Sequence, residues 1–298
     1  MTKFGCFGTL AHGPVLQNKC RESQMAELDA VLNAYNIFFA DATAITFDIN
    51  EANSKNKAIE LLTSYLNVYR EVALPILEAR RNSGQENLRS SILEEFFQIL
   101  LYPLAASVID RYPQALILGK ANSYVSLTFT PRSFSALFEN PVPYIHTKDQ
   151  DFVLGCAVEL SSRIRGTQTK GNSPNVTEVV IPVIAIECKT YIEKNMLDSC
   201  AGTAKRLKSA MPYCLYIVAA EYMKMEEAYP ELTDINELFI LTKASNADRQ
   251  RFKNEGETPH PIDAKLIQDI FDMVSSHLNK IWWSPEDALA RGKVIGRP

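Results

Sequence analysis

A glutamate and a lysine two residues apart carry the strongest chemical signal in this 298-residue chain. An apolar run ends at Ile186 and is followed by Glu187-Cys188-Lys189. In a β-strand, residues i and i+2 share one face, so Glu187 and Lys189 are expected to point together and Cys188 the other way. A carboxylate and an ammonium at a strand end suit metal-assisted hydrolysis of a phosphodiester, in which a positive group stabilises developing charge or positions the attacking water.

Such chemistry needs a second carboxylate, because Mg²⁺ prefers oxygen ligands. The best candidate is Asp151, which directly abuts the apolar run that begins at Phe152, and Asp149 is its competitor. The 36 residues from Asp151 to Glu187 suffice for one strand, a glycine-containing loop and the return strand of a hairpin. The main-chain carbonyl of Cys188 could add a further metal ligand and leave its side chain apolar.

Other interpretations of these acids remain open. Glu187 and Lys189 could form an ordinary salt bridge at a strand end, although the apolar lead-in and the basic helix that follows favour a site. Glu94 or Glu95 could add another carboxylate from a preceding helix, but acids on a solvated helix surface are the more common case.

Charge is distributed unevenly along the sequence. The formal net charge is −4, yet between Ser161 and Leu215 eight Lys and Arg residues face four acids. A basic segment within an acidic protein is compatible with a confined DNA groove. The candidate DNA-binding residues in this segment are Arg163, Arg165, Lys170, Lys194 and Lys205.

The first half of the chain has helical periodicity. Helices are predicted over 23–39, 56–80 and 91–103. Pro75 is expected to kink or end the second, and the third opens with a capping-box pattern at Ser91 and stops at Pro103. We predict a mostly helical region over 1–112.

The second half, 113–298, has strand character, and together the two halves predict an α/β protein with a central mixed sheet flanked by helices. Pro182 argues for a bulge or an edge in the strand that carries Glu187. The predicted strands are 115–118, 124–129, 152–160, 179–188 and 213–220, and the predicted helices are a basic amphipathic one over 193–211, another over 261–280, and one that begins at Ser284-Pro285.

Composition excludes some classes of protein. No apolar stretch approaches the 18 residues of a membrane span, and the N-terminus lacks a signal-peptide pattern. The six cysteines form no Cys-x-x-Cys pair, and reduced, mostly buried thiols are expected. We therefore predict a cytoplasmic protein with no membrane partner.

These residues together resemble a known family. Asp151, then Glu187-x-Lys189, then a basic helix beginning at Lys194, is similar to the PD-(D/E)xK nuclease superfamily. The segment 186–197 resembles the type II restriction endonucleases of the BbvCI group. Gln150 precedes Asp151 where the superfamily name implies proline, a departure that leaves the choice between Asp149 and Asp151 open.

The resemblance implies a restriction-endonuclease-like fold and cleavage of double-stranded DNA at a short specific site. Asp151 and Glu187 would bind Mg²⁺ and Lys189 would orient the nucleophilic water. Each site cuts one strand, so a double-strand break implies a homodimer or a heterodimer with a related subunit. The alternatives are a structure-specific repair or recombination nuclease of the same fold, and a DNA-binding subunit that does not cleave.

Overall fold

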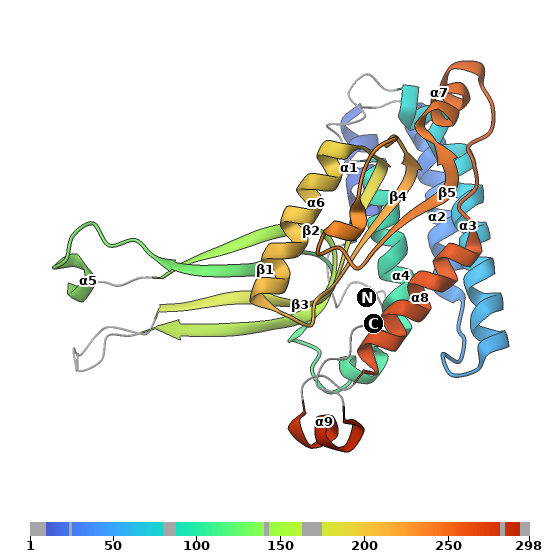
Figure 1. The fold of residues 1–298 in the computed structure, drawn as a ribbon. Helices are drawn as coiled ribbons and strands as arrows, with labels where there is room; N and C mark the ends of the chain where they lie inside the picture. The colour runs from blue at the N-terminus through green and yellow to red at the C-terminus, as the bar shows by residue number, and fades with distance from the viewer. Residues whose placement is uncertain are drawn as a thin grey trace.

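A five-stranded mixed β-sheet with helices on both faces forms the centre of the molecule (Figure 1). The structure, a computed structural model, describes residues 10–23, 26–79, 88–139, 143–162, 175–280 and 284–292. The spatial order is β1-β2-β3-β4-β5, in which β1, β2 and β3 pair antiparallel in turn and β3, β4 and β5 run parallel. The strands are β1 (Leu116–Phe129), β2 (Pro143–Ser162), β3 (Asn175–Ile192), β4 (Leu215–Met223) and β5 (Glu237–Ser245). This is the α/β architecture that the sequence predicts.

The helices form two layers. Most pack on one face of the sheet, while α6 covers the other, where Leu197, Cys200 and Leu207 meet the apolar side chains of β3 and β4. The helices are α1 (Gly13–Ser23), α2 (Ala26–Ala44), α3 (Ala52–Ala79), α4 (Ser90–Ile109), α5 (Ala136–Glu139), α6 (Lys194–Ala210), the 3-10 turn η2 (Pro230–Leu232), α7 (Asn246–Glu255), α8 (Ala264–Leu278) and α9 (Pro285–Arg291). Within the described residues, no helix is long and apolar enough to cross a membrane.

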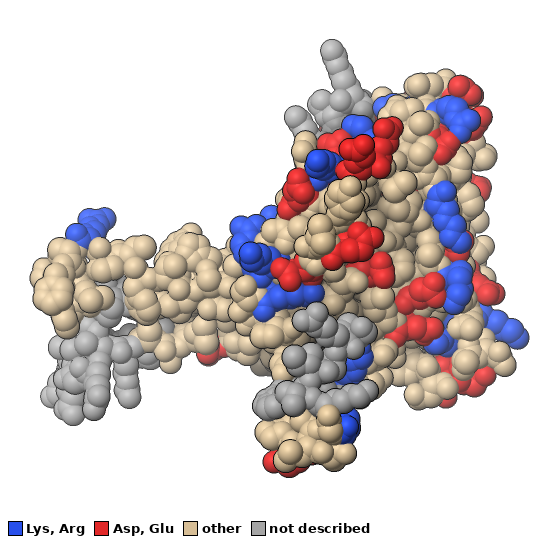
Figure 2. All heavy atoms as spheres, viewed as in Figure 1, with Lys and Arg blue, Asp and Glu red and all other residues tan. Residues whose placement is uncertain are grey.

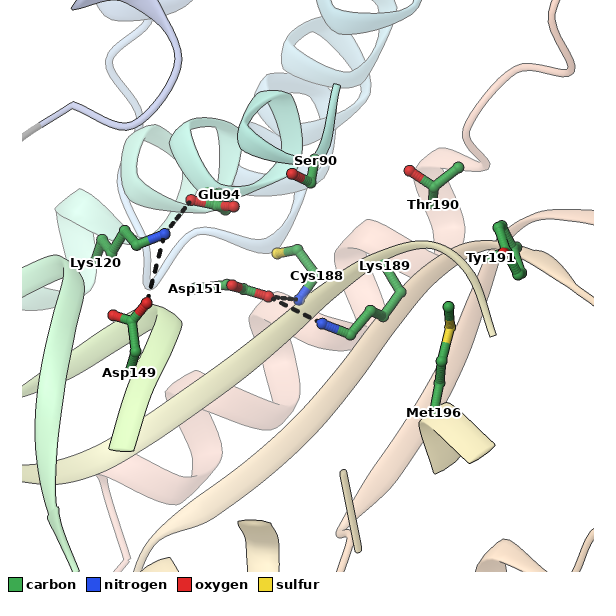
Figure 3. Close-up of a pocket in the computed structure, with 10 residues that line it drawn as sticks. All are labelled: Ser90, Glu94, Lys120, Asp149, Asp151, Cys188, Lys189, Thr190, Tyr191 and Met196. Atoms are coloured by element: carbon green, nitrogen blue, oxygen red, sulfur yellow. Dashed lines mark hydrogen bonds and ion pairs between the residues drawn. The ribbon is translucent and has the colours of Figure 1, made fainter. Parts of the chain in front are cut away.

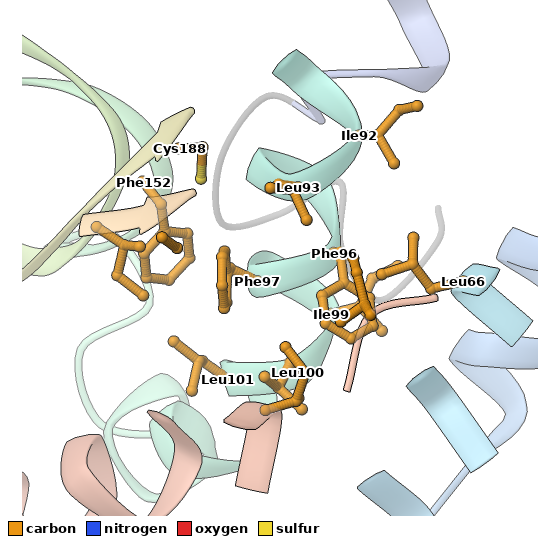
Figure 4. Close-up of a cluster of buried hydrophobic side chains, with 14 of the residues drawn as sticks. Leu66, Ile92, Leu93, Phe96, Phe97, Ile99, Leu100, Leu101, Phe152 and Cys188 are labelled. Carbon is orange, nitrogen blue, oxygen red and sulfur yellow. The ribbon is translucent and has the colours of Figure 1, made fainter. Parts of the chain in front are cut away.

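Helix α4 is the centre of the larger apolar core. Every residue from Ile92 to Leu101 is buried, so α4 contacts the sheet on one side and the outer helices on the other. Figure 4 shows Phe97 facing Phe152 of β2, with the side chain of Cys188 beside them. A helix that is buried all round has no polar stripe, which matters below for the acids that it carries.

The helices agree with the sequence in place but not always in length. The predictions that Pro103 stops α4 and that Ser91 opens it with a capping box are wrong: α4 continues to Ile109, its N-cap is Arg89, and no side chain caps it. Helix α3 likewise runs past Pro75 to Ala79. A proline inside a helix removes one hydrogen bond, and burial of the apolar surface on both helices outweighs that cost.

Five described elements carry no sequence prediction, namely α1, α5, η2, α7 and β5. The two strands predicted over 115–118 and 124–129 are a single strand, β1, with a register shift between Gly119 and Ala121. The predicted Ser284 N-cap is confirmed, because its side chain accepts a hydrogen bond from the amide of Asp287 at the start of α9.

Strand β2 belongs to two hairpins that project from the body. Its first half pairs with β1 out to Phe129 and Pro143, and its second half pairs with β3 out to Ser162 and Asn175. In Figure 1 both hairpins extend to the same side of the molecule, with α5 near the far end of the β1–β2 hairpin. The middle of β2 therefore lies where the two hairpins leave the body.

The bulge predicted at Pro182 is confirmed. The β2–β3 register shifts between Leu154, which pairs with Ile184, and Gly155, which pairs with Pro182, so Val183 is the additional residue. Proline supplies no amide hydrogen to the ladder. A Cβ on Gly155 would lie 2.4 Å from the carbonyl oxygen of Ile181, so glycine permits the close approach of the two strands.

Candidate active site

Asp151 and Glu187 face each other across the β2–β3 hairpin. Phe152 pairs with Ile186, and continuing this antiparallel register by one residue sets Asp151 opposite Glu187. The Cβ atoms of such a pair lie about 4.5–5.5 Å apart. The hairpin predicted from the spacing of the two acids therefore brings them together.

Lys189 lies between these two carboxylates. Its Nζ is 2.5 Å from Oε1 of Glu187 and 3.6 Å from Oδ2 of Asp151. Burial opposes the charge of the ammonium, but Glu187 and Asp151 outweigh it and raise the pKa of Lys189. The group therefore stays protonated at neutral pH and can donate hydrogen bonds but cannot act as a base.

Asp151 and Glu187 each have a further polar neighbour besides Lys189. Oδ2 of Asp151 accepts a hydrogen bond from the amide of Cys188 at 2.8 Å, and the Tyr216 hydroxyl lies 3.4 Å from Oε2 of Glu187. Burial and the neighbouring Glu187 raise the pKa of Asp151. Two carboxylates that share one ammonium thus retain an excess of negative charge.

Cys188 points away from this cluster, as the strand alternation predicts. Its side chain is buried in the larger core. Burial, followed by the charges of Asp151 and Glu94, raises the pKa of the thiol, so the sulfur stays neutral. Cys188 could therefore bind a metal only through its main-chain carbonyl, since its main-chain amide donates a hydrogen bond to Asp151.

Glu94 adds a carboxylate that sequence reasoning placed on a solvated surface, an interpretation that is wrong for both acids of α4. The Glu94 side chain is only 5% exposed and faces the site from α4 (Figure 3). Burial and the charge of Asp151 raise its pKa to about 7. Glu95 is also buried but points elsewhere, where it accepts hydrogen bonds from the amides of His12 and Gly13 and from the Tyr35 hydroxyl.

Lys120 is a second lysine of the site, and sequence reasoning missed it. Its Nζ lies 3.9 Å from Oε2 of Glu94 and 3.8 Å from Oδ2 of Asp149. It occupies the β1 bulge, next to Gly119, whose φ of 135° is a conformation that favours glycine. An isolated glycine inside a strand pattern was the available signal, since it often marks a bulge.

Glu94, Lys120, Asp151 and Lys189 line a pocket of about 400 Å³, and Glu187 lies beside Lys189 outside its lining (Figure 3). Asp149 is 60% exposed at its rim, whereas the Asp151 side chain is 21% exposed and lies beside Lys189. The geometry thus favours Asp151 over Asp149 as the partner of Glu187. The pocket is lined by Ser90, Glu94, Lys120, Asp149, Asp151, Cys188, Lys189, Thr190, Tyr191 and Met196.

The donor set fits a hard divalent cation. The carboxylates of the site are Glu94, Asp149, Asp151 and Glu187, which with two ammonium groups leave a formal charge of −2. Within the described residues, no three acid, histidine or cysteine side chains form a ready-made metal cluster. Mg²⁺ is commonly held by one or two carboxylates together with water and substrate phosphate, so two facing carboxylates suffice.

The predicted DNA-binding residues are only partly described by the structure. Lys194 and Lys205 are exposed on α6, at its first turn and towards its last, and neither lines the pocket. Helix α6 packs on β1 and β3 beside the two hairpins. Arg163, Arg165 and Lys170 lie outside the described residues.

Comparisons with known proteins agree with this architecture. A solved structure described as the native BbvCI A2B2 tetramer at low resolution superposes with a TM-score of 0.66 and 19% identity, covering 91% of this chain and 97% of that chain. At this identity the likeness shows a common fold. Curated protein sequences gave no significant match. The family model described as Bpu10I restriction endonuclease matches residues 85–294, which include β1 to β5 and the whole pocket. Since this match spans more than half of the sequence, the chain belongs to the Bpu10I restriction endonuclease family.

Proposed function

We propose that this protein is a type II restriction endonuclease, or one subunit of such an enzyme, that hydrolyses double-stranded DNA at a specific short site with Mg²⁺. The observation that carries the proposal is the facing pair of Asp151 and Glu187 with Lys189 between them. Membership of a restriction endonuclease family supplies the substrate class.

The side chains of Asp151, Glu187 and Lys189 and the main chain of Cys188 have proposed roles in hydrolysis. Asp151 and Glu187, with the main-chain carbonyl of Cys188, would hold Mg²⁺. The bound ion would polarise the phosphoryl group and lower the pKa of the attacking water. Lys189, which stays protonated, orients that water and stabilises negative charge as it develops on the phosphate.

The surroundings of the pocket suit an anionic duplex. The exposed Lys194 and Lys205 on α6 would contact DNA phosphates, and Arg163, Arg165 and Lys170 of the segment between β2 and β3 would add to them. One chain carries one such site, so a double-strand break requires a second subunit, either a copy of this chain or a related one.

Cleavage of plasmid DNA by the purified protein tests the proposal. With Mg²⁺ we expect products with discrete ends, and sequencing these ends gives the site and the stagger. Lys189→Ala should lower the rate at least about 100-fold, since a preorganised donor of this kind contributes on the order of 10²–10³ in kcat. The matched control is Lys265→Ala, which removes a lysine whose side chain is 67% exposed on α8.

Three results would contradict the proposal. Full cleavage by Lys189→Ala would remove the proposed centre. Preferential cutting of branched junctions over the linear plasmid would indicate a structure-specific nuclease. DNA binding without cleavage in any divalent metal would indicate a binding subunit.

A further inference from the structure

The outer part of the β1–β2 hairpin, residues 122–139 and 143–147, carries aromatic side chains that the protein itself leaves exposed. We call it the aromatic arm. Phe134 is 81% exposed, and Phe129, Phe138 and Tyr144 are between 56% and 60% exposed. Phe134 and Phe138 contact each other edge to face, with ring centroids 5.2 Å apart. Monomeric soluble proteins rarely expose such clusters, so this surface indicates a binding site.

The charge of the aromatic arm favours a protein partner over DNA. In the sequence 122–147 the only Lys or Arg is Arg132 and the only acid is Glu139. Figure 2 shows the projecting hairpin as mostly uncharged, in contrast to the body. Proteins that insert apolar side chains into DNA also contact its phosphates with several cations, which this arm lacks.

A pocket of about 660 Å³ on the body of the molecule has the complementary character. Between β4 and β5, Met223, Met225 and Leu238 contribute apolar walls, and Glu226 and Glu231 contribute negative charge. We call it the methionine pocket. Methionine side chains adapt their shape and make favourable contacts with aromatic rings. In Figure 1, α5 near the tip of the arm lies far from β4 and β5, so the arm does not reach this pocket of its own chain.

We propose that the aromatic arm of one chain docks in the methionine pocket of a second copy, and that the second copy reciprocates. Phe134 and Phe138 would enter the pocket, and Arg132 would meet Glu226 and Glu231 at its rim. The exchange is isologous, since each chain supplies one arm and one pocket, and it therefore closes as a two-fold dimer.

The surface available is adequate for such a dimer. At about 200 Å² for each aromatic side chain, the exposed fractions of the four aromatic residues named above correspond to roughly 500 Å² of exposed aromatic surface on each arm. Two arms and the pocket walls that they cover therefore bury an area on the order of the 1,200–2,000 Å² of a stable interface.

This inference rests on and deepens the proposed nuclease function, since it names the surface through which two chains would associate. The dimer can nevertheless be tested independently of the nuclease activity, because the mass of the protein is measured without DNA or Mg²⁺. Lys189→Ala, which removes the proposed nuclease centre, should form the same dimer.

Light scattering or sedimentation of the purified chain tests the inference. At micromolar concentration we expect a mass of about 67 kDa, twice the chain mass of 33.4 kDa. Phe134→Ser combined with Phe138→Ser should give the monomer, and the exposure of both rings means that the fold is retained. Leu289→Ser is the matched control, because Leu289 is an equally exposed apolar residue on α9 and should leave the dimer intact.

Charge exchange tests the orientation of the contact. Arg132→Glu alone, and Glu226→Arg with Glu231→Arg, should each weaken the dimer, and all three substitutions in one chain should restore it. A monomeric wild-type protein, or a phenylalanine double variant that remains dimeric, would overturn the inference. So would a double variant that keeps its mass but loses affinity for DNA, since the arm would then contact DNA.

Discussion

Replacing Glu94 by glutamine should stabilise the folded protein. The pKa of Glu94 is raised from 4.5 to about 7 by burial and by the charge of Asp151. The folded protein therefore holds a proton at Glu94 more tightly than the unfolded chain does. The ionised carboxylate costs nothing well below pH 4.5, and its cost grows as the pH rises through 4.5 towards 7.

The structure sets the size of this effect. Each pKa unit corresponds to 1.36 kcal/mol, so the ionised Glu94 destabilises the fold by about 3 kcal/mol at pH 8 and by less than about 1 kcal/mol at pH 5. Glutamine has the shape of glutamate and no charge. Glu94→Gln should therefore raise the free energy of unfolding by about 3 kcal/mol at pH 8, which for a chain of this size raises Tm by roughly 5–10 °C.

Denaturant unfolding at pH 5 and pH 8 in EDTA is the appropriate assay. Glu71→Gln is the control, because Glu71 is an exposed acid on α3, and this substitution should change the free energy of unfolding little at either pH. If Glu94→Gln destabilises the protein at pH 8, or stabilises it equally at both pH values, Glu94 is not the strained acid that the geometry indicates.

Two further predictions concern His12 and Tyr216. His12 is buried, and burial lowers its pKa from 6.5 to about 3. The stability that the neutral imidazole contributes to the fold is therefore complete above pH 6.5 and is lost progressively as the pH falls below 6.5. By pH 5.5 this loss amounts to about 1 kcal/mol. In chemical denaturation, the free energy of unfolding of His12→Asn should therefore fall less steeply with decreasing pH than that of the wild type. Equal pH dependence of the two proteins would contradict the assignment. Tyr216→Phe removes only the hydroxyl that contacts Glu187, and because this contact is long at 3.4 Å, cleavage should slow by about tenfold with the fold unchanged. An unchanged rate in a single-turnover assay would mean that this contact does not position Glu187.

The placement of the acids and the lysine on the hairpin could be predicted from the sequence because it follows from strand geometry. Strand alternation fixes which way Glu187, Cys188 and Lys189 point, and an apolar run that begins at Phe152 sets Asp151 at the matching position. These are local rules, and the structure obeys them.

Glu94 and Lys120 could not be predicted in the same way. Helix α4 is buried on all sides, so its periodicity does not show which face meets the sheet, and an acid within it resembles a surface residue. The direction of Lys120 depends on the β1 bulge at Gly119, which the glycine alone suggests but only the pairing with β2 establishes. Both residues reach the site through long-range packing, on which local propensity carries no information.

The bulge at Gly155 and Pro182 divides the β2–β3 hairpin into an inner part, whose length is fixed by the two acids, and an outer part, whose length is free to change. Between the bulge and the acids, one added residue would turn Asp151 or Glu187 to the opposite face of its strand. Beyond the bulge, the hairpin can lengthen, shorten or change its side chains without moving either carboxylate. We expect related nucleases to keep the spacing between the bulge and the acids and to differ in the outer part of the hairpin. New target preferences could then arise while the geometry of the two carboxylates stays the same.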